Sequence, residues 1–279
     1  MVGYDEDIPE NGGVHLKIDF YYWSCQCPLN HEILDLLAEY RDRFEIFLHD
    51  ITGNPELAGR MEMFYPTLTV VEEEYRFYSP LNRAFLDSLQ NEVIPCESPY
   101  LPPFSAMEKV GEIVPITAEN YPIAGACTGR GCPAGCERKI QFLRECGLPV
   151  YGFMNLRDGE LLGGAEFLPS LLVPYDIPKD DKTAFLTCIY RSDPDYDYKS
   201  APLRALEEFL TREYERAVVI SDEAGVFPNG NLAFFERNGY RDCGIVAHDH
   251  YCTLHLMEKP LSFARIGVEN SEGGPLHEN

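Results

Sequence analysis

Before residue 95, segments with the residue pattern of strands alternate along the chain with segments that have the apolar repeat of helices. Residues 14–22 are rich in β-forming side chains, and across 29–43 apolar residues recur at steps of three and four. The remaining predicted elements are a strand over 44–51, a helix over 54–63, a hairpin over 67–78 and a helix over 82–90. Strands that alternate with helices indicate an α/β layer structure.

After residue 108 the pattern contains more strands than helices. The turn signal Arg157-Asp-Gly-Glu joins two predicted strands, over 151–156 and 161–169. Other strands are predicted from residue 112 and over 184–190, 217–221 and 251–257, with helices over about 137–146, from residue 200 and over 232–238. This second series therefore predicts a sheet-rich domain that is distinct from the first.

Proline separates the two series and sets the domain limits. The segment that begins at Pro95 is too rich in proline to continue a helix or a central strand. The expected organisation is a first domain over 1–94, a linker over 95–107, a second domain over 108–263 and a loose tail over 264–279.

Charge and composition exclude several classes of protein. The 279 residues carry a formal net charge of −23, with 45% apolar and 25% charged residues, which is a globular composition. This charge repels a phosphate backbone, so we expect no nucleic-acid partner. The sequence has no run of about 20 apolar residues, so no membrane span is predicted. The acidic start is unlike a signal peptide. Five of the ten cysteines fall in two tight groups, which then favours redox or metal chemistry of thiols in the cytoplasm.

Cys25 and Cys27 lie where the first predicted strand gives way to the first helix, and a helix N-terminus favours a reactive thiolate. With Trp23, Pro28 and the Tyr65-Pro-Thr step, this region resembles the thioredoxin superfamily over about residues 14–92. The resemblance implies a thioredoxin-like α/β sandwich with Cys25 and Cys27 as reactive groups. The family's Cys-x-x-Cys is here Cys-x-Cys, so two readings stay open: a redox or metal-binding role, and a scaffold with incidental cysteines.

Four segments of the second series occur in an informative order. They are Tyr151-Gly-Phe followed by Asp158-Gly-Glu-Leu-Leu-Gly-Gly-Ala-Glu-Phe, then Phe185-Leu-Thr-Cys-Ile-Tyr, Phe234-Phe-Glu-Arg-Asn-Gly-Tyr and Leu254-His-Leu-Met-Glu-Lys-Pro-Leu. This order resembles the GNAT N-acetyltransferase superfamily from about 108 to 261. The fold class expected for the chain is α/β with two domains, a thioredoxin-like sandwich followed by a GNAT-like mixed sheet.

The GNAT resemblance implies acetyl-CoA as the cosubstrate. Its pantetheine arm would pair with the fourth strand, and its pyrophosphate would lie at the mouth of the following helix. The cofactor contacts implied are Cys188, Ile189, Tyr190, Lys199, Ser200, Ala201 and Asn231. Lys199 would supply positive charge and Ser200 would cap the helix. Serine and proline replace the glycines usual in this loop, and Asp197 replaces the usual cation or amide.

Acetylation of an amine needs a base, and often an acid for the leaving thiolate. The base candidates are Glu166 on the third strand of the domain and Asp222 or Glu223 after the fifth. Phe235 occupies the position where the family usually has the tyrosine that protonates the leaving thiolate. His248 and His250, in an expected turn, are weaker candidates. For each of the carboxylates Glu166, Asp222 and Glu223, the more common alternative is an ordinary surface group.

Cys127, Cys132 and Cys136 form the densest thiol group, with glycines between them and Cys146 as a fourth candidate. Their spacing differs from that of zinc ribbons and iron–sulfur runs. The alternatives are a metal site, a reversible disulfide, or small buried residues in a glycine-rich turn.

Two functions follow. The first is an acetyl-CoA-dependent N-acetyltransferase acting on a small-molecule or peptide amine, with a thioredoxin-like accessory domain and no membrane or nucleic-acid partner. The alternative is a thiol redox or metal-handling protein whose GNAT-like domain is catalytically degenerate.

Overall fold

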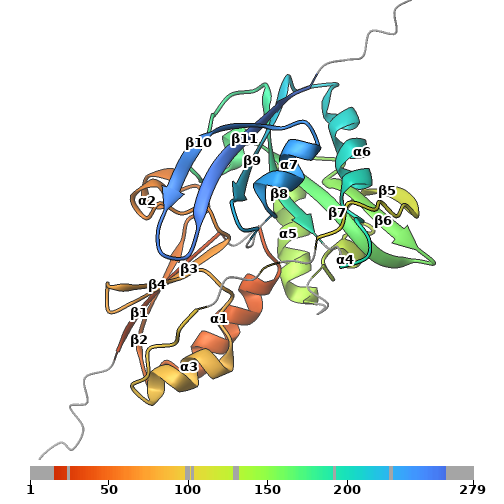
Figure 1. Cartoon of the computed structure of the whole chain (residues 1–279). Coiled ribbons are helices and arrows are strands. Elements are labelled where there is room, and N and C mark those ends of the chain that lie inside the picture. Colours follow the sequence, from red (N-terminus) through yellow and green to blue (C-terminus); the bar gives the residue numbers. More distant parts are fainter. Residues whose placement is uncertain are drawn as a thin grey trace, which may run out of the picture.

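Two β-sheets form the framework of the chain (Figure 1). The computed structural model describes residues 16–23, 26–97, 101, 104–127, 132–190, 193–225 and 229–261. We call residues 16–97 the N-terminal part and residues 104–261 the C-terminal part. The expected α/β class and the mixed sheet in the second half are confirmed.

The N-terminal part holds a four-stranded sheet in the order β2-β1-β3-β4. Strands β1 and β2 are parallel, whereas β3 is antiparallel to both β1 and β4. Apolar side chains of α1 and α3 cover one face of this sheet, where Phe20 and Leu37 are fully buried. The elements are β1 Lys17–Tyr22, α1 Leu29–Glu39, β2 Glu45–Asp50, α2 Pro55–Arg60, β3 Thr67–Val71, β4 Tyr75–Phe77 and α3 Arg83–Gln90.

The C-terminal part holds a seven-stranded sheet in the order β10-β11-β9-β8-β7-β6-β5. All neighbours are antiparallel except β8 and β9, and α6 and α7 cover one face. The elements are β5 Glu112–Ile116, α4 Tyr121–Ala124, α5 Pro133–Glu145, β6 Gly152–Arg157, β7 Glu160–Pro169, η1 Ser170–Leu172, β8 Thr183–Tyr190, α6 Ser200–Leu210, β9 Arg216–Asp222, α7 Leu232–Arg237, β10 Arg241–His248 and β11 Thr253–Pro260. Among the helices that the structure describes, none has the length and apolar composition needed to cross a bilayer.

Strand β10 is an element that the sequence pattern did not predict. Its pairing with β11 is interrupted by two register shifts, and Gly244 adopts a positive φ of 116°. The first five residues of β10 are all exposed. Because an irregular, solvent-facing edge strand shows no alternation of apolar and polar residues, its signal is weak.

The two parts share one apolar core. Trp23, Leu68 and Tyr78 from the N-terminal part belong to the same buried cluster as Tyr175 and Phe185 from the C-terminal part. Helices α1 and α5 lie against each other (Figure 1), and a side chain on Gly135 would overlap the Pro28 carbonyl. The expected domains therefore each have a sheet, but they pack as one body.

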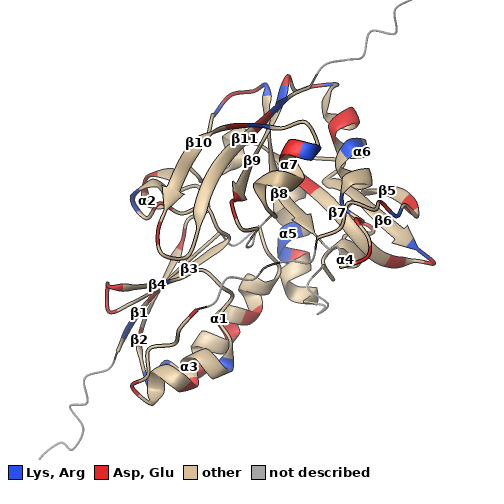
Figure 2. Cartoon of the chain, in the orientation of Figure 1, with Lys and Arg blue, Asp and Glu red and all other residues tan. Residues whose placement is uncertain are grey.

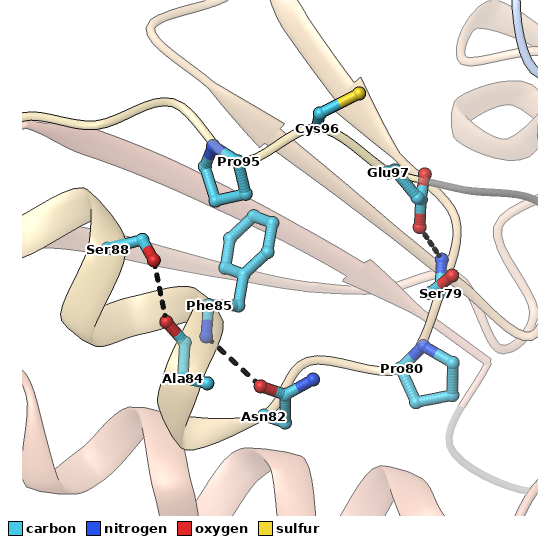
Figure 3. A pocket seen from close by; sticks show the side chains of 9 residues that line it. All are labelled: Ser79, Pro80, Asn82, Ala84, Phe85, Ser88, Pro95, Cys96 and Glu97. Atoms are coloured by element: carbon cyan, nitrogen blue, oxygen red, sulfur yellow. Dashed lines mark hydrogen bonds between the residues drawn. The ribbon is translucent and has the colours of Figure 1, made fainter.

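The proline-rich segment is anchored at both ends. Figure 3 shows Glu97 reaching the start of the loop before α3, where its carboxylate accepts the amides of Tyr78 and Ser79. In the same view the sulfur of Cys96 points away from the ring of Phe85. At the other end, Ser105 donates to the carbonyl of Asp195 over 2.8 Å. This segment is therefore held against both parts of the molecule.

Candidate functional site

The paired strands β8 and β9 separate after a short contact. Their parallel pairing covers only three residue pairs and ends at Phe185 and Val218, although β8 continues to Tyr190 and β9 to Asp222. Backbone groups inside a sheet need hydrogen-bond partners. Asn229, which is buried, bridges the gap: its Oδ1 accepts from Ile189 N over 3.1 Å and its Nδ2 donates to Ile220 O over 3.1 Å.

A bulge in β8 lies in the stretch of this strand that no longer pairs with β9. The register between β7 and β8 shifts at Glu166, so that Thr187 is the extra residue. Gln26, from the N-terminal part, reaches this bulge: its Nε2 donates to Thr187 O over 2.9 Å, and its Oε1 accepts from Tyr175 Oη over 2.5 Å. The side chain is 2% exposed. The loop before α1 therefore extends into the centre of the C-terminal sheet.

Lys139 and Glu166 form a buried ion pair beside Gln26. The Nζ–Oε2 distance is 2.5 Å, and Lys139 Nζ also donates to Gln26 O over 2.9 Å. Burial by itself lowers the pKa of Lys139, but the Glu166 carboxylate outweighs it and raises that pKa above the ordinary value. The structure thus places Glu166 at the centre of the site, engaged with a cation from α5.

Thiols that are far apart in the sequence meet around this ion pair. Cys27, Cys127 and Cys188 each interact electrostatically with Lys139 and Glu166. Burial raises the pKa of all three thiols, to about 11 for Cys27. The expectation that the helix N-terminus lowers the pKa of Cys27 is therefore wrong, because desolvation exceeds the effect of the helix. Cys25 lies outside the described residues.

Two members of the group Cys127, Cys132 and Cys136 lie at the start of α5. Cys132 immediately precedes α5, and Cys136 lies in its first turns against Gly125. Among the residues that the structure describes, no three His, Cys, Asp or Glu side chains form a group that could hold a metal ion. The nine cysteines in these ranges are free thiols. A metal role for Cys127, Cys132 and Cys136 stays a prediction.

Asp197 fills the N-terminal mouth of α6. Its Oδ1 accepts from Lys199 N over 2.8 Å and Ser200 N over 3.1 Å, and its Oδ2 accepts from Ser200 Oγ over 2.7 Å. Arg237 lies 3.4 Å from the same carboxylate, which is 3% exposed. Asp197, rather than Ser200, therefore caps the helix, and the expectation for Ser200 is corrected.

Lys199 is turned into the protein rather than toward an anion. Its Nζ lies 4.4 Å from the centre of the Phe234 ring, and the side chain is buried. Burial lowers the pKa of Lys199 to about 8. The negative charge of Asp197 offsets this lowering only in part, and the positive charge of Arg237 adds to it. The cation that the sequence suggested for this loop is therefore poorly placed to bind a phosphate.

The remaining predicted site residues serve the backbone or the core. Asp222 accepts three main-chain amides, from Ala224, Gly225 and Thr253. Asn231 caps α7 through Phe234 N. Ile189 is buried, Tyr190 and Ala201 are half-buried, and the buried Phe235 ring packs on Tyr240. The hydroxyl of Tyr190 is buried and has no hydrogen-bond partner among the described residues.

Three residues that the sequence analysis passed over hold the site together: Gln26, Lys139 and Asn229. Asn229 and Asp197 had readable signals, since Asn-Gly marks a turn and Asp shortly before a helix is a common cap. Gln26 and Lys139 had none, because their partners lie 161 and 27 residues away in the sequence.

Acetyl-CoA fits this site in one portion and not in the other. Among the described residues no strand pairs with the gap-facing edge of β8 beyond Phe185, so this edge could pair with a thioester arm once Asn229 releases Ile189 N and Gln26 releases Thr187 O. The mouth of α6 does not fit a diphosphate, because Asp197 already uses its amides and Pro202 contributes no N–H.

Comparison with known proteins gives structural neighbours only. No protein-family model matches this chain, and no curated protein matches it. The chain is similar to the ribosomal-protein-alanine N-acetyltransferase from Brucella melitensis, with 16% identity over 54% of this chain and 99% of that one and a TM-score of 0.39. It is also similar to the aminoglycoside 6'-N-acetyltransferase from Enterococcus faecium, with 11% identity over 54% of this chain and 97% of that one and a TM-score of 0.40.

A third neighbour is a putative acetyltransferase from Salmonella typhimurium solved with its cofactor acetyl-CoA. It shares 13% identity over 54% of this chain and 94% of that one, with a TM-score of 0.38.

Proposed function

We propose that the C-terminal part is an acetyl-CoA-dependent N-acetyltransferase. The observation that carries this proposal is the opening between β8 and β9 after Phe185, with the bulge at Thr187 in the stretch of β8 that no longer pairs with β9. An extended ligand with amide groups binds an uncovered strand edge as an added strand. Pantetheine has two such amides, and acetyl-CoA supplies the activated acetyl group.

The acceptor is an amine, on a small molecule or a peptide. The Lys139–Glu166 pair, Gln26 and Tyr175 line the centre beside the bulge. Glu166 is the base candidate nearest this centre, and it could accept a proton only if Lys139 yields its ion pair. Asp222 is less suited, because its carboxylate already accepts three amides.

The N-terminal part is proposed to be a thioredoxin-like domain that serves as the wall of this site. Its sheet order and the position of Cys27 directly before α1 support this interpretation. So does the hydrogen bond from Trp23 N to Pro66 O, which places the Tyr65-Pro-Thr step against the thiol loop. Burial of Cys27 favours a structural use of this domain over redox chemistry.

The proposal is tested on the full chain with acetyl-CoA and a panel of amines. Release of free CoA is measured with a thiol reagent, and the acetylated amine is identified by mass spectrometry. Hydrogen exchange of the amides in β8 should slow on binding, whereas those of the distant β5 serve as the internal control. No slowing in β8 and no CoA release with any amine would refute the proposal.

A second function is favoured by a separate observation. The side chains of Asn229, Gln26 and Asp197 occupy the gap, the bulge and the helix mouth. This favours a protein whose C-terminal part binds a ligand without catalysis or serves only as a structural domain. Binding of acetyl-CoA without CoA release, for every amine in the panel, would support this second function.

A further inference from the structure

The carboxylate of Asp197 has the hydrogen bonds that a bound phosphate would have. It accepts two main-chain amides and one hydroxyl at the start of an 11-residue helix and lies 3.4 Å from Arg237. Anions bind at helix N-termini because the amides and the helix dipole both favour negative charge. Asp197 is thus an anion supplied by the chain itself.

The backbone of Asp197 is fixed as firmly as its side chain. Its N–H donates to Met107 O over 2.8 Å, and its carbonyl accepts from Lys109 N over 3.0 Å. Between these two, Glu108 makes a two-pronged ion pair with Arg204 of α6, with distances of 2.8 and 2.6 Å. The segment before β5 therefore holds Asp197 against the helix from outside.

We propose that Asp197 substitutes for the diphosphate of the acyl donor, so that donor recognition is confined to the thioester arm. This inference rests on the proposed function, and it makes Asp197 a specificity-determining residue. A diphosphate at this mouth would meet a second anion within hydrogen-bond distance, and two like charges repel strongly in a buried site. The amides already bound to Asp197 could not be shared. The 3'-phospho-ADP portion of CoA then adds nothing to affinity.

Titration calorimetry with three probes tests this: CoA, pantetheine and inorganic pyrophosphate. In the wild-type chain, CoA and pantetheine should bind within about threefold of each other, with no measurable pyrophosphate binding. In Asp197→Ala, CoA should bind about tenfold tighter than pantetheine and pyrophosphate binding should appear, because Arg237 and the α6 amides are freed. Asp195→Asn is the matched control, since it removes one nearby exposed charge and should resemble the wild type.

Asp197→Asn covers the case in which the alanine variant does not fold, because it keeps an oxygen for the α6 amides but loses the charge. It should show a smaller gain for CoA, of about threefold. The inference is overturned if wild-type chain binds CoA about tenfold tighter than pantetheine. It is also overturned if folded Asp197 variants bind pyrophosphate no better than the wild type.

Failure of the proposed function looks different. It would appear as no pantetheine or CoA binding and no acetyl transfer in any variant. The pyrophosphate comparison between the wild type and the Asp197 variants would still decide the role of Asp197.

Discussion

Lys139 and Lys199 are equally buried, at 4% and 5% exposed, yet their pKa values move in opposite directions. Lys139 has Glu166 at 2.5 Å, and its pKa is raised. The pKa of Lys199 is lowered to about 8, although Asp197 is only two residues away. The difference lies in what each carboxylate does: Glu166 faces its lysine, whereas Asp197 faces the backbone amides of α6.

A nearby opposite charge does not by itself offset the cost of burying a lysine. The carboxylate must direct an oxygen at the ammonium group, because desolvation of an ion is offset only by close and well-aligned partners. Beside Gln26 this condition is met: Glu166 pairs directly with Lys139, and both belong to the C-terminal part. The link to the N-terminal part is the hydrogen bond that Lys139 Nζ donates to Gln26 O. At the mouth of α6 the carboxylate stabilises a helix end instead. Acidic residues are spread over both halves in Figure 2, so general charge balance cannot explain the contrast.

Removing Glu166 should have the largest effect. Glu166→Gln leaves Lys139 buried without its counter-charge, so the free energy of unfolding should fall by about 3–5 kcal/mol. Urea denaturation measures this change. The exposed pair Glu108–Arg204 offers the control, since Glu108→Gln should cost less than about 1 kcal/mol. A double change of Lys139→Met and Glu166→Leu should restore most of the loss; failure to do so would mean that the charges are not the cause.

Gln26 connects the loop before α1 to the same ion pair. Gln26→Ala removes its bonds to Thr187 O and Tyr175 Oη and leaves two buried polar groups without partners. The expected loss is about 2 kcal/mol in the free energy of unfolding, measured in urea. Gln141→Ala, on the exposed side of α5, is the matched control and should change little. Equal effects of the two would argue that the junction is held by apolar contacts alone.

Lys199→Met should stabilise the protein at pH 7, by roughly 1–3 kcal/mol, because a neutral side chain replaces a buried charge. The pKa of Lys199 is about 8 when folded and 10.5 when unfolded, so between these values the unfolded chain binds more protons. Wild-type stability therefore rises with pH across this window, and the advantage of the variant should shrink from pH 8 to 10.5. Thermal unfolding at several pH values measures it, with the exposed Lys182→Met as control. A constant advantage would contradict the assigned pKa.

The smallest expected effect concerns the rates at which the cysteines react, because labelling them changes the stability of the protein least. Cys96 and Cys243 are exposed and should react first with a maleimide, whereas Cys27 should react slowly because it is buried with a pKa raised to about 11. Peptide mass spectrometry after timed labelling gives the order, and labelling in denaturant gives the control in which burial no longer protects. Fast labelling of Cys27 in the folded chain would show that Lys139 activates it after all.

Most elements of the fold were readable from local pattern. Residues 29–43 and the segment from residue 200 carry a helical repeat because their apolar side chains face a core. In the structure the helices span residues 29–39 and 200–210, so the first ends four residues earlier than predicted. Strand β10 was missed because its exposed residues do not alternate. The site was readable only in part: the role of Glu166 as a base stays a prediction, and Lys139, the partner that engages it, was not foreseen.

Local pattern along the chain was enough to predict most strands and helices in order, the α/β class, the place of the proline-rich segment and the groups of thiols, but not β10. Each of these depends on residues that are neighbours along the chain. Tertiary structure alone decided that Gln26 lies at the bulge of β8, that three distant thiols meet at Lys139, and that Asp197 faces amides rather than Lys199. Charge and reactivity in a buried site depend on which groups lie within a few ångströms, and packing between distant segments sets those distances.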